Sequence, residues 1–254
     1  MKRYCPQCEA ALDVQSQPTI VGQCLRCGWT GNPDEFLTEF KPPMKSNDSC
    51  WTPYVSIDLE TTGLDEVYCQ ILEFGAVIDN WHTPIDELPR FHKYIKPHDE
   101  INGQPYIYGQ PHALALNHEI IRKLASDDPA VNTEICTEEA LGAHFAAWLQ
   151  SHAINPLKVT AAGKNFSSFD RQFLKQVHGF TDHVRFRHRA IDPAVFYWRP
   201  DIDDKLPDTK TCLERAGLDG RVAHTAVKDC ISVIQLVRRG VRKCQLSAPE
   251  KHSV

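Results

Sequence analysis

The stretch "SIDLETTGL", residues 56–64, decides the fold because it combines a buried strand with two carboxylates. Alternation along 54–60 places Ile57 and Leu59 on one face of a strand, and Asp58 and Glu60 together on the other. Acid-x-acid pairs are common by chance in this chain, so the pair alone indicates little. In a strongly β-forming apolar context, however, two like charges are costly unless a cation joins them. The context therefore predicts a metal site.

The chain has 254 residues, of which 42% are hydrophobic and 24% are charged, as is typical of soluble globular proteins. No apolar run approaches the roughly 18 residues that a membrane-spanning helix needs, and the first residues lack the apolar centre of a secretory signal. We therefore expect a cytoplasmic protein that does not contact membranes. The net charge of −5 argues against a uniformly basic nucleic-acid coat, but not against a nucleic-acid enzyme whose acids hold metal ions.

Composition divides the chain into four parts. Residues 1–37 contain two CxxC pairs, and residues 38–51 are predicted to be a linker because they are polar and contain two prolines. Residues 52–244 are predicted to form one α/β domain, and residues 245–254 a flexible tail.

Within the third part, hydrophobic periodicity predicts alternating elements. Strands are expected at 54–60, 70–79, 91–96, 158–163 and 184–191. Helices are expected at 112–125, 138–152, 168–178, 209–216 and 225–243. This order predicts a mixed sheet flanked by helices.

Four cysteines near the amino terminus, Cys5, Cys8, Cys24 and Cys27, form two CxxC pairs separated by fifteen residues. This spacing matches a four-thiolate zinc site, and we predict a zinc ribbon whose one structural Zn²⁺ folds a segment too short for its own core. Unliganded thiols and an iron site are the alternatives. Basic and aromatic residues here offer a face for nucleic acid, although Trp29 is equally explained as a cover over the metal. A protein partner at the ribbon is also open.

Two predicted helices carry further carboxylates in apolar surroundings. In "SSFDRQFLKQV", Asp170 falls inside the apolar arc of the helix. In "AHTAVKDCISVIQLV", Asp229 lies at the edge of the apolar stripe, and His224 precedes it by five residues. Taken singly, an ion pair or a helix-terminus interaction explains Asp170, and a histidine near a helix end is usually structural. The order of these motifs along the chain is more informative than any one of them.

Together the motifs make residues 52–244 similar to the DEDDh exonucleases, which include the proofreading subunit of bacterial DNA polymerase III, ribonuclease T and oligoribonuclease. "SIDLETTGL" resembles their first motif, "NFSSFD" (165–170) their second and "HTAVKD" (224–229) their third. "QILEFGAVI" and "DTKTCLERAGL" resemble their second strand and the short helix before the third motif. The resemblance implies a ribonuclease H-like fold and stepwise release of nucleoside 5′-monophosphates from a 3′ end.

The resemblance also implies a catalytic site in which four carboxylates share two Mg²⁺ or Mn²⁺ ions and His224 is the general base. The four carboxylates are Asp58, Glu60, Asp170 and Asp229. A pocket for the terminal nucleotide would be formed by Thr61, Thr62, Gly63, Leu64, Asn117 and Asn165. For Leu64, a place in the core is the alternative.

Three arginines at 185, 187 and 189 share one face of the predicted strand 184–191. They are explained either as phosphate contacts or, with a slight preference, as protection of an edge strand against pairing with other chains.

We expect a metal-dependent 3′→5′ exonuclease whose partner is single-stranded nucleic acid with a free 3′ end. DNA is slightly favoured over RNA, although these motifs do not report on the 2′-hydroxyl. The alternative is a non-catalytic module that docks nucleic acid or protein through the ribbon and the nuclease fold. Four carboxylates and a histidine in the expected order favour the enzyme, because a docking module does not need them.

Overall fold

The computed structural model describes residues 52–126, 128–220 and 225–246, together with four two-residue strands nearer the amino terminus. These strands pair antiparallel, β1 (Arg3–Tyr4) with β2 (Ala11–Leu12) and β3 (Gly22–Gln23) with β4 (Thr30–Gly31). In sequence, each pair of strands brackets one CxxC pair. The predicted zinc cysteines, the linker 38–51, His224 and residues 247–254 lie outside the described residues.

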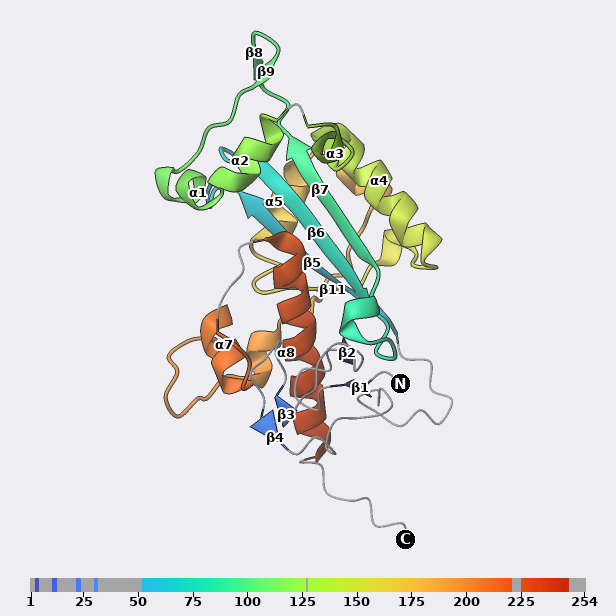
Figure 1. Cartoon of the computed structure of the whole chain (residues 1–254), viewed down its shortest axis with the longest axis vertical. Helices are drawn as coiled ribbons and strands as arrows, with labels where there is room; N and C mark the ends of the chain where they lie inside the picture. The colour runs from blue at the N-terminus through green and yellow to red at the C-terminus, as the bar shows by residue number, and fades with distance from the viewer. Residues whose placement is uncertain are drawn as a thin grey trace.

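A five-stranded mixed sheet in the order β10-β7-β6-β5-β11 forms the centre of the described domain (Figure 1). Its three long strands, β5 (Tyr54–Thr61), β6 (Ile71–Asp79) and β7 (Arg90–Lys96), are joined as an antiparallel meander. Two short strands flank the meander in parallel, β10 (Ile135–Thr137) beside β7 and β11 (Ala161–Ala162) beside β5. The three strand predictions at 54–60, 70–79 and 91–96 are confirmed.

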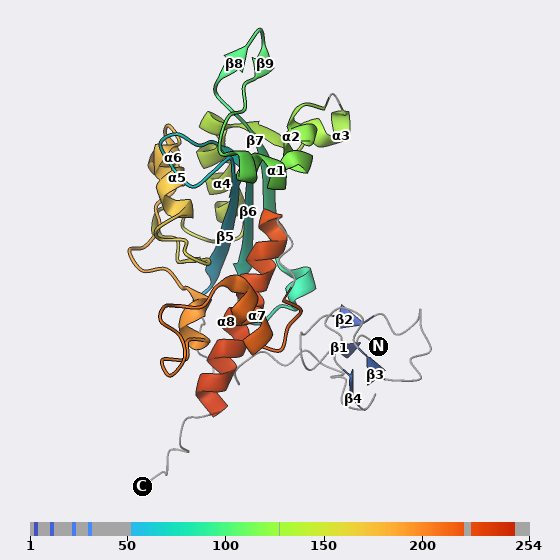
Figure 2. The ribbon, with the colours of Figure 1, turned by 90° about the vertical axis from the view of Figure 1, so that its left-hand side faces the viewer.

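Helices cover both faces of the sheet (Figure 2). One face packs against α8 (Ala226–Leu246), and α7 (Thr209–Arg215) with the 3-10 helix η4 (Pro193–Phe196) packs on the outer side of α8. The opposite face packs against α4 (Glu138–Ser151), α5 (Asp170–Gln176) and α6 (Phe180–His183). The predicted alternation along β5 is confirmed, because Val55, Ile57 and Leu59 enter the core on the α4 side.

A buried ion pair fastens α8 to the sheet. The Arg238 guanidinium, 1% exposed, donates to both carboxylate oxygens of Asp79 at 2.7 and 3.1 Å. The Tyr54 hydroxyl donates to the same carboxylate at 2.7 Å. Both carboxylate oxygens of Asp79 therefore have partners, as a buried pair requires.

Four expected elements differ in the structure. The strand expected at 158–163 is reduced to the two residues of β11. The helix 112–125 is divided at Asn117 into α1 (Pro111–Leu116) and α2 (His118–Leu124). The strand 184–191 is wrong, because this segment pairs with the sheet only through isolated bridges at Phe186 and Ile191. The last helix, α8, continues two residues into the predicted tail.

Several short elements were not expected from the sequence. Besides β10, α6 and η4, they are η2 (Ile85–Glu87), β8 (Glu100–Ile101), β9 (Gln104–Pro105), α3 (Pro129–Asn132) and η3 (Pro156–Lys158). Among the helices in the described ranges, none has the length and apolarity needed to cross a membrane.

Candidate active site

Strand β5 presents two of the predicted carboxylates toward α8. Asp58 lies opposite Gly75 and Glu60 lies opposite Glu73 in the neighbouring strand β6. The pairing register shifts between Glu60 and Thr61, so the strand becomes irregular where it leaves the site.

The first turn of α8 supplies the third carboxylate, Asp229. Gly75 allows the helix to approach β6, because a side chain there would meet the Ala226 carbonyl carbon at 2.6 Å. The Glu73 carboxylate accepts a hydrogen bond from the Ala226 N–H at 3.1 Å and so caps the start of the helix. The Ser56 hydroxyl of β5 donates to a carbonyl oxygen of α8 at 3.0 Å, which ties the strand to the helix.

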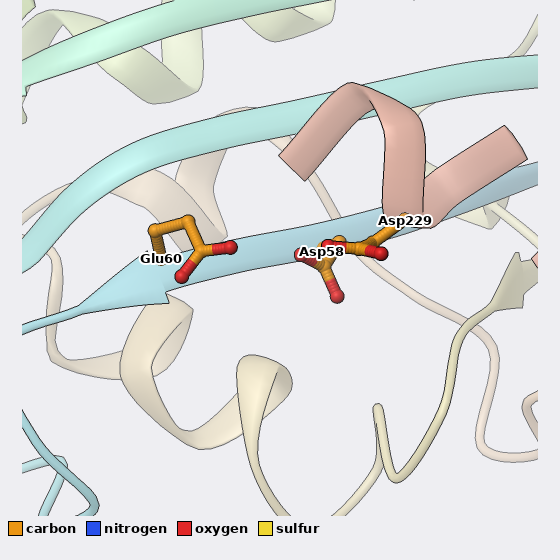
Figure 3. Close-up of side chains that lie close together, drawn as sticks. All are labelled: Asp58, Glu60 and Asp229. Carbon is orange, nitrogen blue, oxygen red and sulfur yellow. The ribbon is translucent and has the colours of Figure 1, made fainter. Parts of the chain in front are cut away.

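The carboxylates of Asp58, Glu60 and Asp229 each offer an oxygen within 4.8 Å of the other two. Figure 3 shows the two strand residues on β5 and Asp229 reaching toward the strand from α8. No described lysine or arginine forms an ion pair with Asp58 or Glu60. Hard carboxylate oxygens gathered in this way fit a divalent metal ion.

Asp170 reaches the same strand from α5, of which it is the first residue. Its Oδ1 accepts a hydrogen bond from the backbone N–H of Leu59 at 3.0 Å, and the residue is 3% exposed. Leu59 lies between Asp58 and Glu60 on β5. This hydrogen bond therefore holds the Asp170 carboxylate beside the two carboxylates of the strand. The expected partner of Asp170 is thus a backbone donor rather than a basic side chain.

Burial and mutual repulsion shift the pKa values of this cluster upward. Burial raises the pKa of Asp58 well above its ordinary value, and the charges of Asp170, Asp229 and Glu60 raise it further. The pKa of Glu60 rises to about 7, mainly through burial and then through Asp229. Burial likewise raises the pKa of Asp170 to about 7, although backbone N–H donors oppose the rise. Such groups bind a proton or a cation, and shifts of this kind are typical of functional sites.

The loop that follows β5 is held by its own side chains. The Thr61 hydroxyl donates to the Gly63 carbonyl oxygen at 2.7 Å, and the Thr62 hydroxyl accepts from the Gln70 N–H at 2.8 Å. Both threonine side chains are therefore engaged within the protein. Leu64 is 73% exposed, so the alternative of a core leucine is wrong and the side chain is free to contact a ligand.

Residues 106–110 are hydrogen-bonded to this loop, and the sequence did not predict these contacts. The Gln70 side chain donates to the Tyr106 carbonyl oxygen at 3.0 Å and accepts from the Tyr108 N–H at 3.1 Å. The Gln110 N–H donates to the Thr62 carbonyl oxygen at 2.8 Å. Two exposed tyrosine rings, 5.7 Å apart, therefore lie beside the loop.

The two predicted asparagines occupy different places. Asn117, buried at the break between α1 and α2, donates to the Thr61 carbonyl oxygen at 3.0 Å, and its hydrogen bond lowers the pKa of Glu60. It therefore lies beside the carboxylate cluster, and its predicted contact with the terminal nucleotide stays a prediction. Asn165 has a φ of +61° and is exposed, and its backbone N–H donates to the Asp192 carboxylate at 3.0 Å. It lines a separate cavity of about 590 Å³.

His224 and the four zinc cysteines lie outside the described residues, so their roles stay predictions. The arginines at 185, 187 and 189 are exposed on a segment that runs beyond β11 at the edge of the sheet. Because no strand forms at 184–191, the edge-protection interpretation loses the strand on which it depended, and the phosphate-contact alternative stays a prediction.

Sequence reasoning missed Glu73, another carboxylate beside the cluster. It is 3% exposed, and its Oε1 lies 2.6 Å from Nε2 of His92 on β7 while its other oxygen caps α8. The signal was present in the sequence. In "QILEFGAVID", Glu73 is a carboxylate inside an apolar strand, which is the same argument that singled out Asp58.

Comparisons with known proteins agree with this geometry. The RNase_T family, described as exonuclease, matches residues 55–237. A structure of E. coli exonuclease I in complex with a 5cy-dT13 oligonucleotide matches with a TM-score of 0.50 and 16% identity, covering 77% of this chain and 41% of that one. Another structure of exonuclease I matches with a TM-score of 0.52 and 15% identity, covering 77% and 42%. No curated protein matches.

Cell-death related nuclease 4 also matches, with a TM-score of 0.50 and 14% identity over 76% of this chain and 65% of that one. The mixed sheet with helices on both faces is therefore the ribonuclease H-like fold that was expected. The chain spans about two fifths of the length of the exonuclease I chains that it matches.

Proposed function

The chain belongs to the RNase_T family of exonucleases, and from that premise we propose that it is a metal-dependent 3′→5′ exonuclease. It removes nucleoside 5′-monophosphates from the free 3′ end of single-stranded nucleic acid, with DNA favoured over RNA. The observation that carries the proposal is the convergence of Asp58, Glu60 and Asp229 within 4.8 Å, with Asp170 bound to the intervening Leu59. The oligonucleotide bound to exonuclease I supports nucleic acid as the substrate class.

Two divalent cations, Mg²⁺ or Mn²⁺, when bound by the four carboxylates, supply a water of lowered pKa and stabilise the charge on the departing 3′ oxygen. Asp58 and Glu60 would hold the cations from the strand, Asp229 from α8 and Asp170 from α5. His224 takes the proton from the attacking water onto an imidazole nitrogen, since imidazole titrates near neutrality. The bond between phosphorus and the 3′ oxygen breaks as the water oxygen bonds to phosphorus.

The loop after β5 binds the terminal nucleotide. Leu64 contacts the base, and backbone groups of Thr61, Thr62 and Gly63 lie near the terminal 3′-hydroxyl. Asn117 fixes the loop through the Thr61 carbonyl. Asn165 supports the turn that precedes α5. The exposure of Leu64 and the hydrogen bonds within the loop support these assignments.

The amino-terminal segment is a zinc ribbon in which Cys5, Cys8, Cys24 and Cys27 hold one structural Zn²⁺. The cysteine spacing and the two strand pairs that bracket the cysteines support this assignment. The ribbon binds nucleic acid or a protein partner.

The experiment that tests the proposal is a gel assay of purified, zinc-loaded protein with Mg²⁺ or Mn²⁺. The substrates are 5′-labelled single-stranded DNA and RNA of one sequence, and Asp58→Ala and His224→Ala are assayed alongside. We expect a ladder that shortens from the 3′ end with wild-type protein and no products with Asp58→Ala. His224→Ala should lose at least about a hundredfold in kcat and keep its affinity for Mn²⁺.

Each outcome has a distinct meaning. The ratio of DNA to RNA rates decides the substrate preference. Unchanged turnover in His224→Ala would remove this residue from the mechanism. No cleavage of either substrate by folded wild-type protein would reject the nuclease and favour a docking module.

A further inference from the structure

Residues 156–191 carry an excess of positive charge in an acidic chain. They contain seven lysines and arginines, two aspartates and no glutamate, whereas the whole chain has a net charge of −5. One of the two aspartates is Asp170, at the candidate metal site. A local excess of basic residues in an acidic protein indicates a site for a polyanion, and this segment also carries one of the predicted metal ligands.

A cavity of about 350 Å³ opens within this basic segment, between α5, α6 and residues 185–188. Its rim carries Arg171, Lys175, Arg185 and His188, and no carboxylate lines it. Within the described ranges, none of these lysine and arginine side chains forms an ion pair. The positive charge of the rim is therefore not neutralised by a protein carboxylate, and the rim favours an anionic occupant.

The inner wall of the same cavity is apolar. It is formed by Leu174, Phe180, Val184 and Phe186, and the two phenylalanine rings stack at 6.1 Å. Cavities of about 300 Å³ and more are of the size that holds small organic groups. An occupant must therefore combine a flat apolar part with negative charge, and a nucleotide has both in its base and its phosphate.

The cavity is joined to the candidate active site through α5. Asp170 is the first residue of this helix, Arg171 follows it directly, and Lys175 lies about one turn beyond Arg171. Arg171 donates to the carbonyl oxygens of Arg187 and His188 at 3.2 and 3.4 Å, which holds residues 187–188 against the helix. Figure 2 shows α5 and α6 together on the side of the sheet away from α8.

We infer that this cavity binds a nucleotide of the substrate strand that lies upstream of the nucleotide being removed. The base enters between the apolar side chains, and the flanking phosphates contact Lys175 and Arg185. The inference rests on the proposed function and extends it, because it adds a second contact for the single strand beyond the metal site. A duplex cannot insert a base in this way, so the cavity also selects for unpaired strands.

The test compares two variants that change the net charge equally. Lys175→Glu/Arg185→Glu alters the cavity rim, where both side chains are exposed and hydrogen-bond only to near neighbours. Arg90→Glu/Lys210→Glu is the control, with two exposed cations outside the cavity. Both are made in the Asp58→Ala background, so that binding is measured without cleavage. Fluorescence anisotropy then follows labelled dT12 and dT2 as KCl is raised.

We expect the cavity variant to bind dT12 roughly tenfold more weakly than the control, with a salt slope shallower by about 1.4, as for two lost phosphate contacts on a single strand. The affinity for dT2 should match that of the control. A series of dT12 strands, each with one abasic site at a different distance from the 3′ end, locates the base in the cavity. At one position the abasic site should weaken binding of the strand by the control and leave binding by the cavity variant unchanged. Equal binding by the two variants, or no such position, would overturn the inference.

One further arm separates a strand from a free nucleotide. If thymidine 5′-monophosphate binds the control as tightly as dT12 does and fails to bind the cavity variant, the cavity takes a free nucleotide and the inference is wrong. Because binding needs no turnover, these results stand apart from the cleavage assay. Absence of wild-type cleavage would reject the proposed function, whereas the anisotropy data decide the cavity.

Discussion

Glu73 is the residue whose single replacement best separates charge from structure at this site. Its charge raises the pKa of Glu60 and of Asp58, and its carboxylate also caps α8 at the Ala226 N–H. Glu73→Gln removes the charge and keeps an oxygen for the cap. The pKa values of both neighbours then fall, so they ionise at lower pH. We expect the acid limb of the pH profile of kcat/KM, measured with Mn²⁺, to move to lower pH.

Two companion variants make this result specific. Glu73→Ala also removes the cap, and we expect it to lower the free energy of unfolding by about 1–2 kcal/mol more than Glu73→Gln does. Glu134→Gln removes a charge 3.7 Å from His92, on the far side of that histidine, and should leave the acid limb in place. An acid limb that stays fixed, or moves upward, in Glu73→Gln would contradict the electrostatic role of this residue.

At the scale of elements, the site depends on how closely α8 approaches β6. Gly75 permits this approach, because an added Cβ would lie 2.7 Å from Val227 N and 2.6 Å from the Ala226 carbonyl carbon. Backbone atoms cannot rotate away, so Gly75→Ala must displace the start of the helix that carries Asp229. We expect a loss of about 1–3 kcal/mol in the free energy of unfolding. We also expect at least about a tenfold loss in kcat, since about 1 Å of misplacement at a site can cost a hundredfold.

The control for this prediction is Val77→Ala on the same strand. Val77 packs against α8, and its truncation should also destabilise the protein, by about 1–3 kcal/mol, while leaving space rather than forcing the helix outward. Urea unfolding and steady-state kinetics at full folding compare the two. If Val77→Ala loses as much kcat as Gly75→Ala does, stability rather than helix position explains the effect.

Elements also show where sequence reasoning succeeds. Alternation along β5 predicted the shared face of Asp58 and Glu60, and the apolar arc of α5 predicted a buried Asp170, because both signals are local. The donor that binds Asp170 is the N–H of Leu59, 111 residues away, and no periodicity encodes such a contact. The strand expected at 184–191 failed for a related reason. Its side chains favour strands, but its neighbour β11 has only two residues to pair with.

At the scale of the whole molecule, the carboxylate cluster should make stability depend jointly on pH and metal. The pKa values of Glu60 and Asp170 are about 7 in the folded protein without metal, and that of Asp58 is also raised. Unfolded aspartate and glutamate titrate near pH 4, so between about 4.5 and 7 the folded state binds more protons than the unfolded state. The contribution of these groups to the free energy of unfolding therefore falls as pH rises through this window.

A divalent cation reverses this trend, because it binds the ionised carboxylates of the folded state alone. Adding Mn²⁺ at a hundredfold excess over its dissociation constant should stabilise the protein by about 2.7 kcal/mol at pH 7.5. The gain should be much smaller at pH 5.5, where protons compete. Thermal unfolding with and without Mn²⁺ at both pH values measures the difference. The variant Asp58→Asn/Glu60→Gln keeps the amino-terminal segment and so corrects for binding of Mn²⁺ outside the carboxylate cluster. If the gain were equal at both pH values, or equal in the variant, the cation would be acting at another site.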